Sequence, residues 1–372
     1  MEYLHFGNAS GEPLVILPGL SLKSVMNLKD LIVSAYAPLA KDYDLYLFDH
    51  IEEEPEGYGI ADMAKDTLNA FDRLGLDRIH LVGVSMGGMV AQTIALLAPD
   101  RMRSLILCST AMNTVHGDPA VFAEWQMLAE QRNTEALAAA FGKSVYTPSF
   151  FEAFKAPILA SCSGATERDF RNFLISLSAA RAFDVSDEIR KIACPVYVLG
   201  AGEDRVLGTQ AAYDLIEALR CAHDIYDGYG HGVYDEAPDY LDHIAAVLKG
   251  EKTFRLAMKH IYGDGVPEDN DLAFTLLTEA RALGHMEATY NLGVCCHYGC
   301  GTDVDLSKAF ALYLESAEAG YGKGMELVGR FYNRGIFVKR DRTQAERWLK
   351  NAMESGDPDA VEEAKKEWSV SQ

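Results

Sequence analysis

The residues best suited to chemistry lie in the run Gly83-Val84-Ser85-Met86-Gly87, which has the pattern G-x-S-x-G. An apolar run at 79–84 precedes it and a helical pattern starting near Gly87 follows it, so we predict a strand, a sharp turn and a helix. In such a turn the serine backbone is strained, the glycines leave room for neighbouring chain, and the hydroxyl projects above the sheet. The alternative is a chance glycine-rich turn. We predict that Ser85 is a nucleophile.

A serine hydroxyl is a poor nucleophile unless a base lies next to it, and a third group must orient that base. Ten histidines compete for this role. His231, in Gly230-His231-Gly232, follows the last predicted strand and lies on a loop at the carboxyl edge of a parallel sheet, where active sites gather. His50 and His116 also follow predicted strands and remain minor alternatives. We predict that His231 is the general base.

The orienting acid should follow the preceding strand, and the run 196–200 leads into Ala201-Gly202-Glu203-Asp204. We choose Asp204, because Glu203 next to it is expected to point elsewhere. Asp49 closes an earlier strand and is a weaker alternative, since a carboxylate there readily hydrogen-bonds to local backbone.

Short apolar runs alternate with amphipathic segments through the first 250 residues, which predicts a mostly parallel sheet flanked by helices. The runs lie at 14–17, 45–48, 79–84, 105–108, 196–200 and 222–226. About 85 residues separate the fourth run from the fifth, against the short connections that are usual. We predict a helical insertion at about 113–190, and a helix from about Asp239 to Leu248.

The segment from about residue 252 onward repeats itself with a period of 36 residues, as the alignment of Gly263, Gly299 and Gly335 shows. The spacing predicts two helices per repeat, with Gly284 and its equivalents ending the second helix in a left-handed cap. We therefore predict two regions: residues 1–250, and an all-α array of three helical hairpins at 252–372.

The stretch from about Tyr3 to Leu248, with its order Ser85, Asp204, His231, resembles the α/β-hydrolase superfamily. The resemblance implies an oxyanion hole made by the backbone amides of Leu20 and Met86. Leu20 belongs to Pro18-Gly19-Leu20, in which Pro18 replaces the histidine usual in relatives. The resemblance also implies that the insertion is a cap over the nucleophile.

The periodic segment resembles the Sel1-like repeats, relatives of the tetratricopeptide repeats, in the loops G-D-G-V-P-E-D (263–269) and G-C-G-T-D-V-D (299–305). That resemblance implies a protein-interaction surface, which would bind a partner, join two copies of the chain or pack against the cap. In the third copy Ile336 and Phe337 replace the second small residue of the loop, so we expect an altered loop there.

The chain of 372 residues has a net charge of −21, and its first 250 residues, with 35 acidic against 19 basic side chains, carry −16 of it. Because such a surface repels phosphate backbones, we expect no nucleic-acid partner. No apolar run approaches the 18 residues of a membrane span, no secretion signal opens the chain, and seven scattered cysteines suit a reducing compartment. We expect a cytoplasmic protein.

Other motifs favour no cofactor. No phosphate-binding glycine loop follows the first predicted strand, so nucleotide cofactors have no support. The group Cys295-Cys296-His297 with Cys300 falls on a predicted repeat helix where small buried residues are expected, and we assign it no metal. The acidic run Glu52-Glu53-Glu54 is expected to be a solvated loop.

These features predict a serine hydrolase that cleaves a carboxylic ester or related acyl bond through a Ser-His-Asp triad and an acyl-enzyme. The aromatic residues of the insertion favour a small, partly apolar acyl substrate. The alternative is a weakly active or non-catalytic ligand-binding domain on a repeat scaffold that recruits a protein partner, an idea motivated by the repeats and by Pro18.

Overall fold

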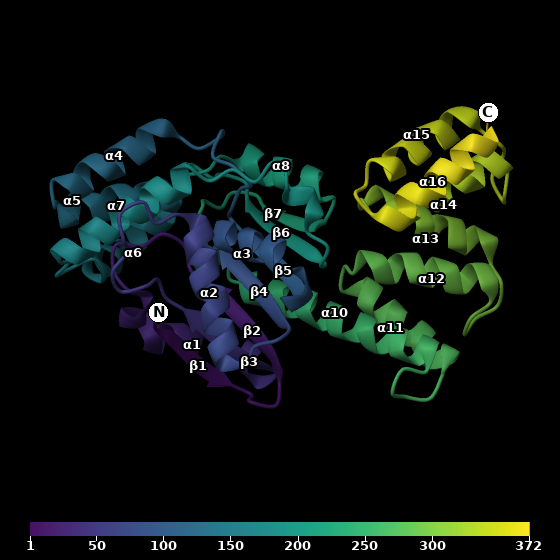
Figure 1. Cartoon of the computed structure of the whole chain (residues 1–372), viewed down its shortest axis with the longest axis horizontal. Helices are drawn as coiled ribbons and strands as arrows, with labels where there is room; N and C mark the ends of the chain where they lie inside the picture. The colour runs from purple at the N-terminus through teal and green to yellow at the C-terminus, as the bar shows by residue number, and fades with distance from the viewer. Residues whose placement is uncertain (372) are drawn as a thin grey trace. The chain divides into compact units, whose positions relative to one another are not determined.

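A mostly parallel sheet forms the centre of the first half of the molecule (Figure 1). The structure is a computed structural model that describes residues 1–371, and within these residues seven strands pair in the order β1-β3-β2-β4-β5-β6-β7. The strands are β1 (Tyr3–Gly7), β2 (Glu12–Leu17), β3 (Tyr43–Phe48), β4 (Ile79–Val84), β5 (Met102–Cys108), β6 (Val196–Ala201) and β7 (Ala222–Tyr226). The predicted fold class is confirmed.

Strand β1 is the element that the apolar runs did not predict. It pairs antiparallel with β3, whereas β3, β2, β4, β5 and β6 pair in parallel. It has no buried residue and alternates between exposed and half-buried positions, while β3 and β4 are buried along their whole length. A strand at the edge of a sheet therefore lacks the continuous apolar run of a central one.

Helices surround this sheet; four of them lie between successive strands and the short α9 follows the last strand. They are α1 (Lys29–Ala35), α2 (Ile60–Leu74), α3 (Met86–Leu97), α8 (Thr209–Leu219) and the short α9 (Val233–Glu236). Helix α2 is strongly amphipathic and buries Met63, Ala64 and Phe71. Helix α3 is apolar nearly all round, because it contacts β2, β4 and β5 as well as α2.

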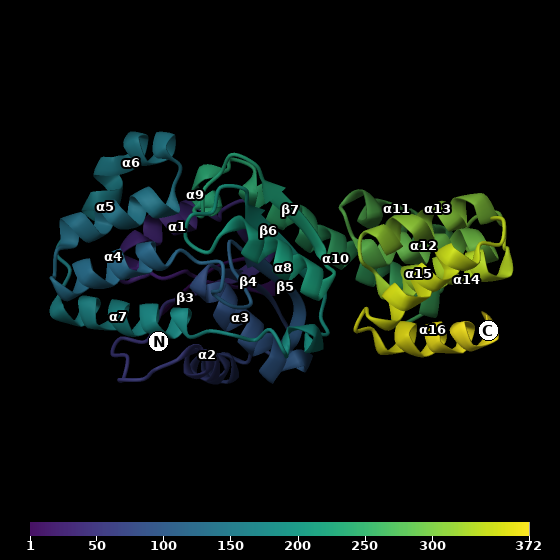
Figure 2. The same cartoon turned by 90° about the horizontal axis from the view of Figure 1, so that it is seen from above.

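The insertion between β5 and β6 is helical. It contains α4 (Pro119–Glu130), α5 (Thr134–Val145), α6 (Pro148–Ser161) and α7 (Glu167–Arg181), which lie together in Figure 2. An isolated antiparallel β-bridge between Asn113 and Asp184 pairs the segment that enters these helices with the segment that leaves them. Trp125, Phe151 and Phe173 form the buried interior of the insertion.

The chain divides into two compact units. The first contains Met1–Leu219 and His223–His243, and the second contains Arg220–Ala222 and the chain from Ile244 onward. The helix predicted to end at Leu248 continues instead as α10 (Tyr240–Tyr262), so that prediction is wrong. A single Gly250 does not stop a helix that packs at its other positions.

The second unit is an array of antiparallel helices (Figure 1). After α10 come α11 (Asn270–Ala282), α12 (Met286–Tyr298), α13 (Leu306–Glu318), α14 (Gly322–Arg334), α15 (Arg342–Met353) and α16 (Pro358–Ser371). An aspartate caps the N-terminus of the second helix in each hairpin, and these aspartates recur every 36 residues. The carboxylates of Asp269, Asp305 and Asp341 each accept a hydrogen bond from the backbone amide of the residue three positions later. The predicted left-handed residues are confirmed, with φ of 82°, 100° and 80° at Gly284, Gly320 and Gly356.

The loop of the third repeat keeps the backbone of the other two. Gly265 and Gly301 have φ of 71° and 65°, and Phe337 in the equivalent place has φ of 60°. The altered loop that we expected is therefore absent at this position. The Phe337 ring lies 6.2 Å from that of Phe310, a packing contact that a glycine lacks.

Cys295 and Cys296 are buried in the apolar interior of the repeats. His297 Nδ1 lies 3.2 Å from the hydroxyl of Tyr313. Across the described part of the chain, no three His, Cys, Asp or Glu side chains gather as metal ligands, and no helix is long and apolar enough to span a bilayer.

Candidate active site

Ser85 forms the turn between β4 and α3 and has a strained backbone, with φ of 52° and ψ of −119°. The turn is tight because other backbone segments lie very close to Gly83 and to Gly87. A Cβ on Gly83 would lie 2.6 Å from the Gly87 carbonyl oxygen, and one on Gly87 would lie 2.2 Å from the Leu17 carbonyl oxygen. Only glycine fits at both positions, so packing holds the serine in this conformation.

The structure brings Ser85, His231 and Asp204 into one hydrogen-bonded chain. His231 Nε2 lies 2.8 Å from Ser85 Oγ, and His231 Nδ1 lies 2.8 Å from Asp204 Oδ2. An ionised carboxylate only accepts, so Nδ1 carries the proton and Nε2 accepts from the serine hydroxyl. The three residues follow β4, β6 and β7, whose carboxyl ends share one edge of the sheet.

Asp204 is buried, with 6% of its side chain exposed, yet it is held in its charged form. Its Oδ1 accepts bonds of 2.8 and 2.9 Å from the amides of Val206 and Leu207. Burial alone raises the pKa of this carboxyl, but His231 and the hydrogen bonds outweigh it and hold the pKa below its usual range. The carboxylate is thus fixed in place and available to orient His231.

Leu20 and Met86, the two residues expected to supply oxyanion amides, both line the cavity that contains Ser85. Met86 is the first residue of α3, where an amide has no acceptor within the helix. The chain before Leu20 passes so close that a Cβ on Gly19 would lie 3.1 Å from Ser85 Cβ. Pro18 leaves this approach intact.

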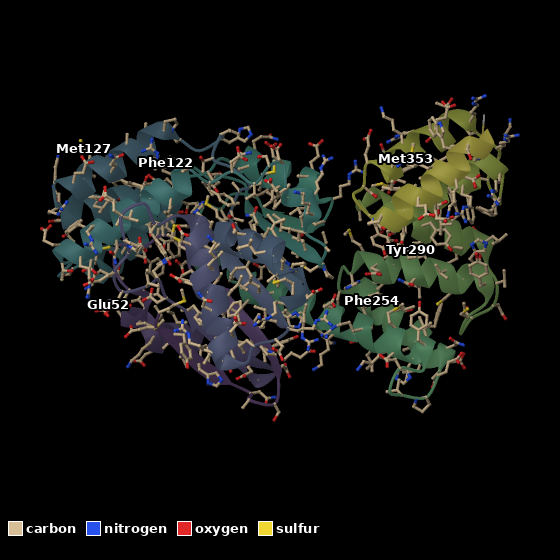
Figure 3. The ribbon with its side chains drawn as sticks, viewed as in Figure 1. Glu52, Phe122, Met127, Phe254, Tyr290 and Met353 are labelled. Carbon is tan, nitrogen blue, oxygen red and sulfur yellow. The ribbon has the colours of Figure 1, made fainter. Side chains whose placement is uncertain are left out.

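The cavity above Ser85 has mostly apolar walls and a free volume of about 30 Å³. Phe122, Trp125, Phe141 and Leu177 from the insertion line it together with residues of the sheet edge. Helix α4 has a buried face and an exposed face, as two residues labelled in Figure 3 illustrate. Phe122 lines the cavity and is 8% exposed, whereas Met127 is 47% exposed.

The alternative residues have other partners. His116 Nε2 lies 2.7 Å from Asp214, and His50 Nε2 lies 3.5 Å from the Gly19 carbonyl oxygen. Asp49 accepts from the Ser24 hydroxyl and from the His50 amide. Glu203 is exposed and lies 4.0 Å from Arg205.

Sequence reasoning missed two contributors to the site. Thr110 Oγ1 donates a 2.7 Å hydrogen bond to the Ser85 carbonyl oxygen and so braces the turn. Its place just after a predicted strand, at the same sheet edge, was the available signal. Trp125 is one of the aromatic residues of the insertion, but nothing in the sequence shows that it lines the cavity.

Glu54 corrects the expectation of a solvated acidic run, because it is 1% exposed. Its carboxylate accepts from Ser176 Oγ on α7 at 2.8 and 2.9 Å, and its amide donates to Asn172 Oδ1 at 3.3 Å. Burial raises the pKa of Glu54, and the nearby His50, Ser176 and Arg171 only partly offset this. The loop after β3 is therefore fastened to the insertion.

The chain is similar to known proteins in both of its regions. The family model described as alpha/beta hydrolase fold matches residues 12–238, and the chain belongs to this family. The Sel1 repeat model matches three times, at 253–285, 287–321 and 322–357, and confirms the predicted repeats.

Individual relatives cover the first region. "Putative carbamate hydrolase RutD" of Pseudomonas savastanoi pv. phaseolicola is 27% identical over 214 residues, which are 54% of this chain and 82% of the relative. Among solved structures, the enol-lactonase of Burkholderia xenovorans LB400 has a TM-score of 0.56 at 22% identity, covering 66% of this chain and 94% of the other. An esterase of Thermogutta terrifontis has a TM-score of 0.54 at 21% identity, covering 66% and 90%. At these identities the two structures show the shared fold alone.

Proposed function

We propose that this protein is a serine hydrolase that cleaves a carboxylic ester or a related acyl bond. The observation that carries the proposal is the hydrogen-bonded chain from Ser85 through His231 to Asp204, placed under a mostly apolar cavity. Relatives named as carbamate hydrolases add the carbamate to the bond types worth testing.

In this mechanism His231 Nε2 takes the proton of Ser85 Oγ while the oxygen attacks the acyl carbon. Asp204 keeps the imidazole in the required tautomer and stabilises its positive charge. The amides of Leu20 and Met86 donate to the oxyanion, and each donor contributes about 3 kcal/mol in the transition state. His231 then returns the proton to the leaving alcohol. In the second half, His231 takes a proton from water, the water oxygen attacks the acyl carbon, and the bond to Ser85 Oγ breaks as His231 returns the proton to that oxygen.

The cavity supports a compact, partly apolar substrate. Its free volume of about 30 Å³ holds one or two water molecules, so short acyl groups fit with the least rearrangement of side chains. We further propose that the insertion is the cap that shapes this cavity.

We also propose that the protein acts in the cytoplasm.

Labelling with a fluorophosphonate tests the proposal. We expect Ser85-dependent labelling of the intact chain, abolished in Ser85→Ala and slowed in His231→Gln. A panel of esters of increasing acyl length, with a carbamate included, then identifies the preferred bond. An unlabelled wild-type protein that is folded would refute the hydrolase assignment and leave the ligand-binding alternative.

For the repeats we propose a protein-interaction or self-association role, supported by their match to the Sel1 family. Sedimentation of the intact chain over a range of concentrations separates the two, because self-association makes the mass depend on concentration. A mass that stays monomeric at every concentration would exclude self-association.

A further inference from the structure

Trp125 on α4 has a buried hydrogen-bond donor without an acceptor. The residue is 2% exposed, and its Nε1 has no hydrogen-bond partner among the described residues. A buried indole N–H is normally satisfied, because leaving a donor unpaired away from water is unfavourable. This exception lies in the wall of the same cavity as Ser85 and His231.

Three of the four other polar side chains that line this cavity are hydrogen-bonded within the protein. Ser85 and His231 bond to each other, and Thr114 Oγ1 donates to the Arg181 carbonyl oxygen at 3.0 Å. Tyr234 is partly exposed, so water can reach it. Among the described residues that line the cavity, none is Lys, Arg, Asp or Glu.

The indole is held in place by its neighbours. Its ring centre lies 4.5 Å from that of Phe141, and the Phe122 ring meets it edge-on at 6.0 Å. A donor fixed by packing loses little freedom when it binds an acceptor, which makes it effective in recognition.

We propose that Trp125 Nε1 donates a hydrogen bond to a neutral acceptor oxygen of the substrate, distinct from the carbonyl that Ser85 attacks. The inference rests on the proposed hydrolase function and defines its substrate class: uncharged, compact acyl compounds with a second acceptor such as an ether or ketone oxygen. A carboxylate or ammonium group would be left unpaired in this cavity and is therefore disfavoured.

The test compares wild type with Trp125→Phe, which keeps an aromatic ring and removes the donor. Two pairs of substrates of matched size are used: 4-nitrophenyl 3-methoxypropanoate against pentanoate, and 2-methoxyethyl acetate against butyl acetate. We expect Trp125→Phe to lower kcat/KM for one of the two methoxy substrates about tenfold more than for its hydrocarbon partner. Equal effects within both pairs would overturn the proposal.

Phe141→Leu is the matched control, because it alters the same wall without changing a polar group. We expect it to lower kcat/KM equally within each pair. A thermal melt of each variant checks that both retain the wild-type fold.

A second measurement does not depend on turnover. In Ser85→Ala, the indole N–H resonance of Trp125 is assigned by its absence from the double variant with Trp125→Phe. We expect it to move downfield on addition of a methoxy ester and to stay in place with the hydrocarbon esters. An unmoved resonance with both methoxy esters would contradict the proposal, whereas failure of fluorophosphonate labelling in wild type would count against the hydrolase function instead.

Discussion

Two residues in different units share an uncommon positive φ: Ser85 has φ of 52° and Phe337 has φ of 60°. Both are non-glycine residues in a region that disfavours a side chain. At Ser85, the close backbone packing of Gly83 and Gly87 and the hydrogen bond from Thr110 hold the turn in place. At Phe337 the equivalent positions of the other repeats are glycines, and the side chain is 56% exposed.

A positive φ at a non-glycine residue therefore has different origins in the two units. In the first unit the strained residue carries the hydroxyl that we propose as the nucleophile, so glycine there would remove the proposed function. In the repeats the periodic backbone imposes the conformation, and the side chain is incidental to it. Substitutions at and around the two positions should therefore have different consequences.

The largest effect is expected at Ser85 itself. Ser85→Gly should lower kcat/KM by at least about 10⁴-fold, because the proposed nucleophile is lost. Its free energy of unfolding should not fall, since glycine adopts this φ without strain. Ester kinetics and urea denaturation measure both quantities. A variant that loses stability along with activity would show that the lost hydrogen bond to His231 and the entropy gained by the unfolded chain outweigh the relief of strain.

The next effect concerns glycines that touch neighbouring backbone. Gly87→Ala should destabilise the sheet unit by about 3 kcal/mol, because the new Cβ meets the Leu17 carbonyl oxygen and the chain must shift. Gly301→Ala should have a similar cost in the repeats, where a Cβ would lie 2.0 Å from the Asn270 carbonyl oxygen. Denaturation of both variants checks this, with Gly57→Ala as a control for positive φ without close contact. Gly57 and Gly301 have positive φ and Gly87 does not, so equal losses in Gly301→Ala and Gly57→Ala would assign the cost at Gly301 to φ alone. Unchanged stability of Gly87→Ala would contradict the close-contact argument.

The third prediction concerns pH. Because burial raises the pKa of Glu54, the folded state favours its protonated form, so the contribution of Glu54 to stability is present at low pH and falls as pH rises through the raised pKa. Glu54→Gln, which mimics the protonated acid, should remove this slope and be more stable than wild type at pH 8. Urea denaturation between pH 4 and pH 8 measures it. Glu52→Gln, at an exposed neighbour, should keep the wild-type slope.

The smallest effect returns to Phe337. Phe337→Gly should raise the free energy of unfolding by about 0.5–1 kcal/mol, because relief of the left-handed strain exceeds the entropy that glycine adds to the unfolded chain. Phe337→Ala, which keeps the strain and removes the ring, should be no more stable than wild type. If Phe337→Gly is destabilised as well, then the contact with Phe310 outweighs the strain.

Much of the fold was predictable because each signal is local. Continuous apolar runs mark the buried strands from β2 to β6, and the 36-residue period marks the repeats. The run at β7 is weaker, because only one residue of this strand is buried. The runs could not show β1, which has one neighbour in the sheet and no buried side chain. Nor could they show that α10 passes through Gly250, because packing decides whether a helix continues past a glycine.

For the candidate site, sequence order and strand ends were enough to select Ser85, Asp204 and His231, since the carboxyl ends of parallel strands share one edge. The sequence by itself thus determined the residue types, their order and the elements that carry them. Only the tertiary structure decided that Glu54 is buried, that Thr110 braces the turn and that the Trp125 donor lies unpaired in the cavity wall. Burial and hydrogen-bond partners depend on residues far apart along the chain, and no local pattern encodes them.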